Sequence, residues 1–154
     1  MNVINPPTIV RDIALLVARI IVGVVLIAHG LQKLVPWGVG ATADGFAQMG
    51  VPLPQYAAPL AAVIEVAGGV LLLAGCYSAV AGAVVALLMG GAAGFAHIGN
   101  GLFVTDGGWE LVGVIAAAAL AVGVAGAGRF SVDAVVSRRT PEAAALQERE
   151  PVGV

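Results

Sequence analysis

The sequence has few charged residues, few aromatic residues, two histidines and one cysteine. Charged side chains make up 10% of the 154 residues, whereas an average soluble domain carries about 25%. The single cysteine, Cys76, excludes a disulfide within the chain and a C-x-x-C redox pair. With only two histidines we expect no metal site. Because the sequence has no cluster of basic residues, we also expect no nucleic-acid partner.

Apolar residues, by contrast, are abundant. The hydrophobic set makes up 60% of the chain, and the mean hydropathy is +1.01. Four nearly uncharged runs, each close to the ~20 residues needed to cross the hydrocarbon core, cover residues 12–35, 57–77, 78–98 and 109–128. Because backbone groups in lipid must be hydrogen-bonded internally, these runs should be helices. The sequence therefore predicts an all-α fold, a transmembrane four-helix bundle.

The basic residues predict how this bundle is oriented. Arg11 precedes the first run, and four arginines follow the fourth run: Arg129, Arg138, Arg139 and Arg149. The positive-inside rule then places both termini in the cytoplasm of a multi-pass protein of the plasma (inner) membrane. We divide the chain into a four-span membrane domain, residues 1–133, and a cytoplasmic C-terminal tail, residues 134–154.

Ionisable residues inside the four runs recur at helical spacing together with small residues. Because small residues let helices approach closely, each such stripe should face the interior of the bundle. The four stripes are Arg19, Gly23, Leu26, Gly30 and Lys33; Ala58, Ala61, Glu65, Gly68, Leu72 and Cys76; Ala79, Ala83, Ala86, Gly90, Ala93 and His97; and Glu110, Gly113, Ala117, Ala121 and Val124.

Two of these residues are expected to meet near the middle of the membrane. At ~1.5 Å per residue, Arg19 and Glu65 lie at depths that differ by only a few ångströms. We therefore predict an Arg19–Glu65 ion pair. The sequence leaves two roles open for this ion pair: it either fixes the register of the two helices or lines a ligand cavity. A cavity of about 300 Å³ or more lined by Arg19, His29 and Glu65 would favour a ligand.

A polar pocket open to the outer side is the second expectation. It would be lined by Glu65 and by six residues of the outer half or its rim: His29, Lys33, His97, Asn100, Asp106 and Glu110. Some of these have a structural alternative: Lys33 could extend to the headgroups, Glu110 could stabilise a helix N-terminus, and a histidine could bond a neighbouring helix. Because His29 lies deeper than His97, a bis-histidine haem is disfavoured, and we expect no intrinsic cofactor.

Several segments resemble a known family. They read R-I-I-V-G-V-V-L-I-A-H-G-L-Q-K-L from Arg19, E-V-A-G-G-V-L-L-L-A-G from Glu65 and G-A-G-R-F-S-V-D from Gly126. Their order is similar to that of the DoxX family of four-helix membrane proteins, named for the membrane subunit of a thiosulfate:quinone oxidoreductase. The resemblance covers about residues 13–133. The family pattern falls on Arg19, Gly23, His29, Gly30, Lys33, Glu65, Gly68, Gly69, His97, Glu110 and Asp133.

Three functions remain open at this point. In the first, the chain is a subunit of a redox-linked complex that binds quinone and receives electrons from a protein partner. Its catalytic, proton-passing residues would be Glu65 and His29, and its substrate-binding residues would be Arg19, Lys33, His97 and Glu110. The alternative is a non-catalytic membrane anchor or assembly subunit, and the third is a small-molecule transporter. The expected partners are the lipid bilayer, other proteins of a complex and further copies of the chain.

Overall fold

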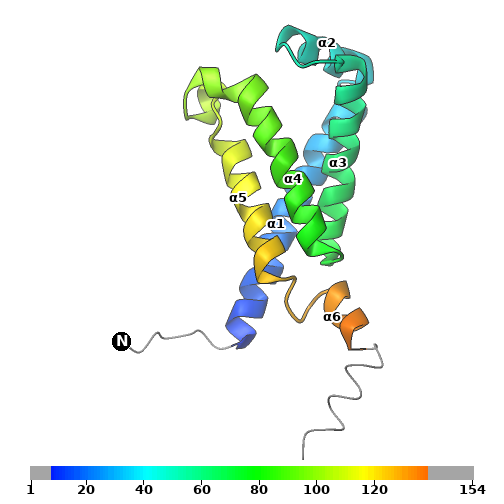
Figure 1. Ribbon diagram of the computed structural model, residues 1–154, viewed down its shortest axis with the longest axis vertical. Helices are drawn as coiled ribbons and strands as arrows, with labels where there is room; N and C mark the ends of the chain where they lie inside the picture. The colour runs from blue at the N-terminus through cyan, green and yellow to red at the C-terminus, as the bar shows by residue number, and fades with distance from the viewer. Residues whose placement is uncertain (1–7, 139–154) are drawn as a thin grey trace, which may run out of the picture.

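The computed structural model describes residues 8–138, and all regular elements among them are helical (Figure 1). Four helices follow the long axis: α1 (Thr8–Leu34), α3 (Pro54–Ala74), α4 (Ser78–Ala92) and α5 (Glu110–Ala125). The helix α2 (Val39–Gln48) lies across one end, and α6 (Val132–Ser137) lies at the other end, beside the start of α1. The predicted all-α class is confirmed.

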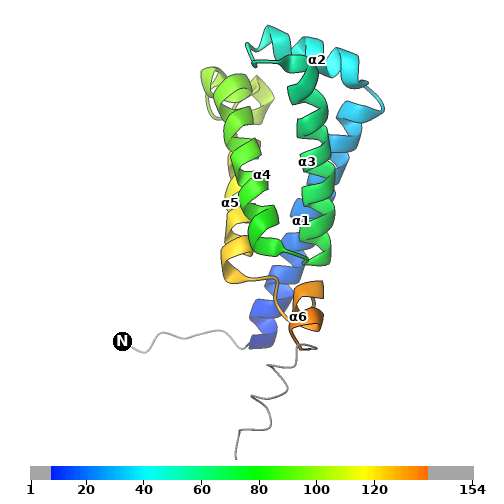
Figure 2. The same ribbon diagram turned by 45° about the vertical axis from the view of Figure 1, so that its right-hand side comes forward.

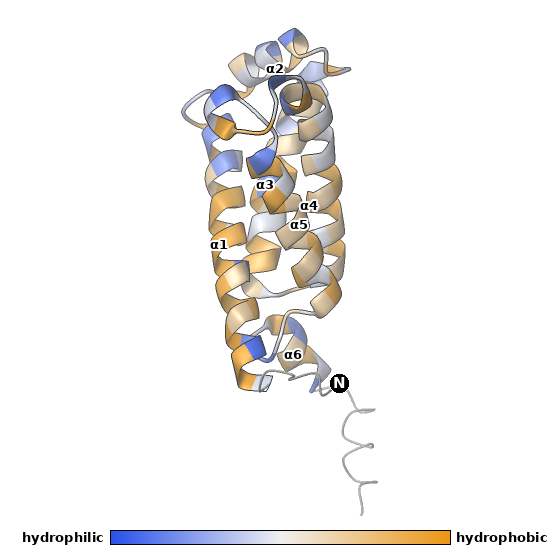
Figure 3. Ribbon diagram, turned by 90° about the vertical axis from the view of Figure 1, so that its left-hand side faces the viewer, coloured by the Kyte–Doolittle hydropathy of each residue, from blue (hydrophilic) through white to orange (hydrophobic). Residues whose placement is uncertain are grey.

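The long helices are organised as two pairs. Helix α1 packs along α3, and α4 packs along α5, while thinner contacts of α3 with α4 and of α1 with α5 join the pairs (Figure 2). The shared core is apolar and includes Leu26, Leu72, Val85, Ala119 and Val122. Hydrophobic residues follow the length of the bundle and hydrophilic residues gather at its ends (Figure 3), as expected of a protein that lies in a bilayer.

Three helical segments are long and apolar enough to cross a membrane: Thr8–Leu34, Pro54–Ala74 and Ser78–Asn100. The third continues α4 through a π-helical turn, η1 (Ala93–His97), and a 3-10 turn, η2 (Ile98–Asn100). Helix α5 is apolar but has 16 residues, which extend for about 24 Å. The membrane class is therefore established. The count of four spans and the cytoplasmic termini stay predictions.

The connections between helices have clear local causes. Helix α3 starts with Pro54 in its first turn and ends at Gly75, which adopts the left-handed conformation at φ 66°. Tyr77, also left-handed at φ 48°, then starts α4, so the chain reverses in a short hinge of three residues, 75–77. The predicted runs 57–77 and 78–98, which follow each other directly, require such a hinge. A 3-10 turn, η3 (Val104–Asp106), lies in the loop before α5. Of the predicted tail, residues 139–154 lie outside the described residues, and its boundary after residue 133 falls inside α6.

The predicted interior stripes of α1 and α3 are confirmed. Arg19, Gly23, Leu26 and Gly30 are buried on α1, and Ala58, Ala61, Glu65, Gly68 and Leu72 are buried on α3. The glycines explain the close packing of this pair, since a Cβ atom on Gly23 would lie 2.8 Å from the carbonyl oxygen of Gly69. The α1 and α3 backbones are therefore in direct contact.

The predicted stripes of α4 and α5 are wrong. Ala79, Ala83 and Gly90 are exposed, as are Ala117, Ala121 and Val124. The faces that are buried instead carry Ala81, Gly82, Val85 and Met89 on α4, and Ile115, Ala119 and Val122 on α5. Both helices are apolar on every side, so small residues do not mark one face. On the inner faces, Gly82 packs against the backbone of Ala119 where α4 meets α5, and Val85, Met89 and Ile115 belong to the shared core.

Candidate functional site

The side chain of Arg19 lies inside the α6 end of the bundle and is 1% exposed. Its Nε donates to the carbonyl oxygen of Leu72 at 3.0 Å, and its Nη2 donates to that of Leu73 at 2.9 Å. Its Nη1 donates to the carbonyl oxygens of Ala127 at 2.6 Å and Phe130 at 3.1 Å. The last carbonyls of a helix lack intrahelical partners. Arg19 thus joins α1 to the end of α3 and to the segment that follows α5.

The predicted Arg19–Glu65 ion pair is therefore wrong. Gly23 lies opposite Gly69 and the helices run antiparallel, so Glu65 lies opposite residue 27, eight residues or about 12 Å along the axis from Arg19. Side chains on a helix also lean toward its N-terminus. The two side chains consequently point to opposite ends of the bundle, which a depth estimate from residue counts does not reveal.

Glu65 pairs instead with Lys33. The Nζ of Lys33 lies 3.0 Å from Oε1 and 2.7 Å from Oε2 of Glu65, and it also donates to the carbonyl oxygen of His29 at 3.4 Å. The Lys33 side chain is 15% exposed and that of Glu65 is 7% exposed. Within residues 8–138 this is the one side-chain salt bridge. The N-terminal lean that separates Arg19 from Glu65 brings Lys33 and Glu65 together.

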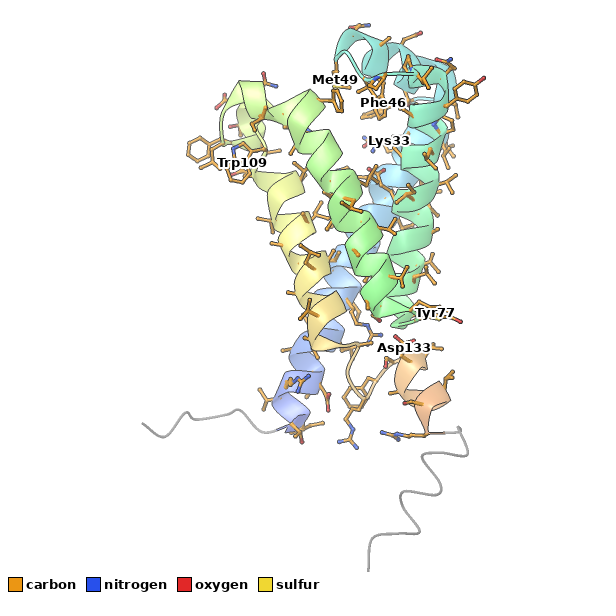
Figure 4. The ribbon with its side chains drawn as sticks, viewed as in Figure 1. Lys33, Phe46, Met49, Tyr77, Trp109 and Asp133 are labelled. Atoms are coloured by element: carbon orange, nitrogen blue, oxygen red, sulfur yellow. The ribbon has the colours of Figure 1, made fainter. Side chains whose placement is uncertain are left out.

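Helix α2 lies across the end of the bundle near the Lys33–Glu65 pair. Thr42 is buried and donates its hydroxyl to the carbonyl oxygens of Lys33, at 3.1 Å, and Gly38, at 2.9 Å. Phe46 and Met49 extend from the underside of α2, on the side of the bundle where Lys33 is drawn (Figure 4). Two apolar side chains, Phe46 on α2 and Met49 directly after it, thus lie at the same end of the bundle as the pair, and we call them the apolar margin.

His29 borders this site without facing into it. Its ring Nδ1 lies 2.9 Å from the carbonyl oxygen of Val25, one turn back on the same helix, and the side chain is partly buried. The ring thus bonds the backbone of its own helix and not that of a neighbouring helix, as the structural alternative had it. The role of His29 as a catalytic residue stays a prediction.

His97 and Glu110 belong to the other helix pair. The ring Nδ1 of His97 lies 2.8 Å from the carbonyl oxygen of Gly107, and a carboxylate oxygen of Glu110 accepts from the backbone N–H of Val104 at 2.7 Å. Both residues thereby order the loop that joins α4 to α5. Over residues 8–138, no hydrogen bond or ion pair connects them to Lys33 or Glu65. The expected seven-residue pocket is thus divided between the two helix pairs, since Asn100 and Asp106 also lie in this loop.

Two cavities stand out, and neither lies at these residues. The larger, about 390 Å³, is lined by Ala74, Arg129, Phe130, Ser131, Val132 and Val135. The smaller, about 200 Å³, is lined by Ala79, Ala83, Leu120, Gly123 and Val124. The large cavity that Arg19, His29 and Glu65 were expected to line is not one of them. Among the described residues there is also no group of three or more histidine, cysteine or carboxylate side chains able to hold a metal ion.

Asp133 has a role that sequence reasoning missed. Its carboxylate accepts from the backbone N–H groups of Tyr77, at 2.9 Å, and Ser78, at 3.2 Å, and from the Ser78 hydroxyl, at 3.1 Å. It caps the start of α4 from α6, as Figure 4 shows for Asp133 and Tyr77. Its own N–H donates to the carbonyl oxygen of Gly75. An N-cap carboxylate normally precedes its helix along the chain, so one supplied from 55 residues downstream leaves no local signal.

The pKa of Asp133 reflects this capping. Partial burial alone would raise it, but the hydrogen bonds from Ser78 and Tyr77, followed by the positive charge of Arg19, lower the pKa below its ordinary value. The carboxylate is thus charged at neutral pH and adds its negative charge to the positive N-terminal end of α4.

These features define the class of the protein. It is an all-helical membrane protein that buries ionisable residues within its apolar helices. The sequence profile of the DoxX family matches residues 14–98, more than half of the chain, and the chain belongs to this family. The matched part includes Arg19, Lys33 and Glu65 but ends before Asp133.

Two curated proteins are similar in sequence. The chain is 36% identical over 81 residues to "Putative oxidoreductase CatD" of Bacillus subtilis (strain 168), covering 53% of this chain and 58% of that protein. It is 35% identical over 68 residues to "Inner membrane protein YphA" of Escherichia coli (strain K12), covering 44% and 47%. The chain thus spans about half the length of these relatives. No solved structure matches it.

Proposed function

We propose that the chain is the membrane-embedded subunit of an oxidoreductase complex of the plasma (inner) membrane, and that it binds a quinone headgroup at the Lys33–Glu65 pair. The observation that carries the proposal is this ion pair, enclosed within the outer half of the α1–α3 pair. Charged residues inside a membrane are costly and by default mark a function. The names of the two relatives, an oxidoreductase and an inner membrane protein, support the same setting.

The chemistry of the pair suits a quinone. A quinone offers neutral carbonyl oxygens to hydrogen-bond donors, and the ammonium group of Lys33 carries three N–H bonds. All three are engaged, by the two oxygens of Glu65 and by the carbonyl oxygen of His29, so a quinone would replace the His29 oxygen, which at 3.4 Å is the most distant of them. When a quinone takes up two electrons it also takes up two protons, so a carboxyl group beside it provides a route for a proton. We assign carbonyl binding to Lys33 and proton transfer to Glu65. The electrons are supplied by a partner protein of the complex.

The apolar margin fits the rest of the ligand. Phe46 and Met49 lie above the pair on α2, and Met49 is 39% exposed. An aromatic side chain favours offset stacking with a flat ring. The side chain of Lys33, more exposed than that of Glu65, is the part that a headgroup arriving from the lipid would meet first.

The test is quinone binding by the full chain in lipid nanodiscs, titrated with short-chain ubiquinone and menaquinone. Lys33→Met should weaken binding about tenfold or more, because it removes a charged hydrogen-bond donor. Glu65→Gln should retain binding but slow quinone reduction in membranes that contain the partners. Glu110→Gln, a carboxylate change on the other helix pair, is the matched control. Unchanged binding by a folded Lys33→Met variant would contradict the proposal.

A second candidate is a non-catalytic anchor or assembly subunit of such a complex. It is favoured by the saturation of the interior, since no buried side-chain nitrogen or oxygen atom of the described residues lacks a hydrogen-bond partner. On this view Lys33 and Glu65 only hold α1 to α3. Their variants would then reduce the amount of folded protein, while quinone-linked electron transfer per folded molecule would stay the same.

A further inference from the structure

The larger cavity, at the opposite end from the Lys33–Glu65 pair, has no role in the proposed function. It is a shallow hollow, wide open to the outside, where the segment before α6 meets the end of α3, and its volume is about 390 Å³. Four of its six lining residues are apolar: Ala74, Phe130, Val132 and Val135. The two polar ones are Arg129 and Ser131.

The apolar wall continues along the outside of α3. Val63, Val70 and Ala74 are exposed and lie on one face of the helix at spacings of seven and four residues. A hydrocarbon chain can therefore run from the cavity along α3 toward the middle of the bilayer. On the other wall Val132 and Val135 are also exposed.

Arg129 provides a positive charge that the described part of the chain leaves available. Its guanidinium lies over the Phe130 ring, 5.8 Å from the centroid, and makes no hydrogen bond or ion pair with a side chain or backbone group of residues 8–138. The hydrogen bond that Arg129 does make comes from its backbone N–H, which donates to the carboxylate of Asp12. Four arginines and two aspartates of the described residues lie at this end, which gives it a net charge of +2: Arg11, Arg19, Arg129, Arg138, Asp12 and Asp133.

We infer that this cavity binds one anionic phospholipid, with its phosphate on Arg129 and an acyl chain in the apolar lining and along α3. Charge complementarity favours an anion, and anionic lipids are drawn to basic residues at a membrane surface. A free anion would leave the apolar lining unused. A peptide would need backbone partners, and the hydroxyl of Ser131 is already bonded to the carbonyl oxygen of Gly128 and the N–H of Ala134. This inference is independent of the quinone site.

The experiment measures lipids retained by the purified full chain. Native mass spectrometry in a mild detergent would compare phosphatidylglycerol with phosphatidylcholine of the same acyl chains. We expect the wild type to retain phosphatidylglycerol preferentially. Arg129→Gln should reduce that preference about tenfold, because a charge-assisted hydrogen bond is lost. The matched control is Arg138→Gln, which removes the same charge from an exposed position outside the cavity lining and should change the preference less than twofold.

Three results would overturn the inference: no preference in the wild type, equal losses in the Arg129→Gln and Arg138→Gln variants, or displacement of the lipid by glycerol phosphate. The second would mean that attraction is spread over the basic end, and the third that the site recognises the headgroup anion alone. Thermal unfolding in phosphatidylcholine checks that both variants are folded. Should Arg129→Gln fail to fold, Val135→Asp tests the same site, because a carboxylate in the lining repels the lipid phosphate.

Discussion

A buried positive charge is stabilised in different ways at the two ends of the bundle. At the α6 end, Arg19 donates to four backbone carbonyl oxygens and forms no salt bridge with a described residue, although the charge of the nearby Asp133 carboxylate interacts with it. At the α2 end, Lys33 depends on a single carboxylate, Glu65, and on one long bond to a backbone oxygen. The first arrangement is saturated by groups that cannot titrate or leave. The second consists of side chains that can exchange a proton or a partner, which is what a ligand site requires.

The comparison separates a structural role from a functional one on physical grounds. Removing Arg19 takes a donor away from buried carbonyl oxygens of two segments, the end of α3 and the segment after α5. Removing the Lys33–Glu65 pair as a unit, by contrast, leaves no buried charge behind. The α6 end should therefore govern folding and the α2 end should govern activity. The following predictions test that division.

The largest effect is expected from Arg19→Met. The variant leaves buried carbonyl oxygens at the end of α3 and after α5 unpaired, so the free energy of unfolding should fall by about 3–5 kcal/mol. Thermal unfolding in detergent and the yield of monodisperse protein would measure it. Arg19→Lys should recover only part of the loss, since an ammonium cannot reproduce the planar geometry. An Arg19→Met variant with the same free energy of unfolding as the wild type would contradict a structural role for the α6 end.

A smaller effect is expected from Glu65→Gln, which leaves Lys33 without its counter-charge. We expect a loss of about 2–3 kcal/mol in the same assay, because a hydrogen bond between charged groups is lost. The double variant Lys33→Met with Glu65→Leu should be more stable than Glu65→Gln, since it removes both charges and fills the space. If the double variant is the less stable of the two, the pair is a structural element like Arg19.

The sequence allowed more of the α1–α3 pair to be predicted than of the α4–α5 pair. On α1 and α3 the charged residues and the glycines lie on one face, so helical spacing identifies the buried side. On α4 and α5 alanine and glycine occur all round, and the inner face is set by the fit of Val85, Met89 and Ile115 against the other pair. That fit is tertiary information, which helical spacing along one chain does not contain.

Prediction of the candidate site from the sequence has the same limit. The residues of the predicted outer-half site were identified because burying an ionisable group in a membrane costs free energy. Their partners were not identified, because the partner of a side chain depends on its direction and on the helix register. Glu65 was assigned to Arg19 on depth alone, and the lean of the side chains assigns it to Lys33. The cap that Asp133 provides depends on the return of the chain to the hinge after α5.

Glycine substitutions compare a packed position on α1 with an open position on α4. Gly23→Ala places a methyl group against the backbone of α3, 2.8 Å from a carbonyl oxygen. It should lower the free energy of unfolding by about 1–3 kcal/mol through overpacking. Gly90→Ala on α4 meets open space and should be neutral, or stabilising by up to about 1 kcal/mol through helix propensity. Equal destabilisation by both would indicate that Gly90 packs against another copy or a partner protein.

The smallest effect is expected from the pH dependence of the Asp133 cap. Because its pKa is lowered in the folded chain, the cap stabilises the fold fully above the unfolded value of about 3.9. That contribution is lost as the pH falls through the lower folded value. Asp133→Asn should cost about 1 kcal/mol at neutral pH. The difference between wild type and variant in thermal unfolding should then shrink below about pH 4.

The difference between the two proteins is the quantity to measure, because other carboxylates also titrate in this range. Asp106→Asn is the matched control, an exposed aspartate in the outer loop whose side chain makes no hydrogen bond to residues 8–138. It should unfold like the wild type at every pH. If the stability difference between Asp133→Asn and the wild type is the same at pH 3 and pH 7, the side chain holds α6 through its shape and not through its charge. The stability of the α6 end would then depend on no titrating group at all.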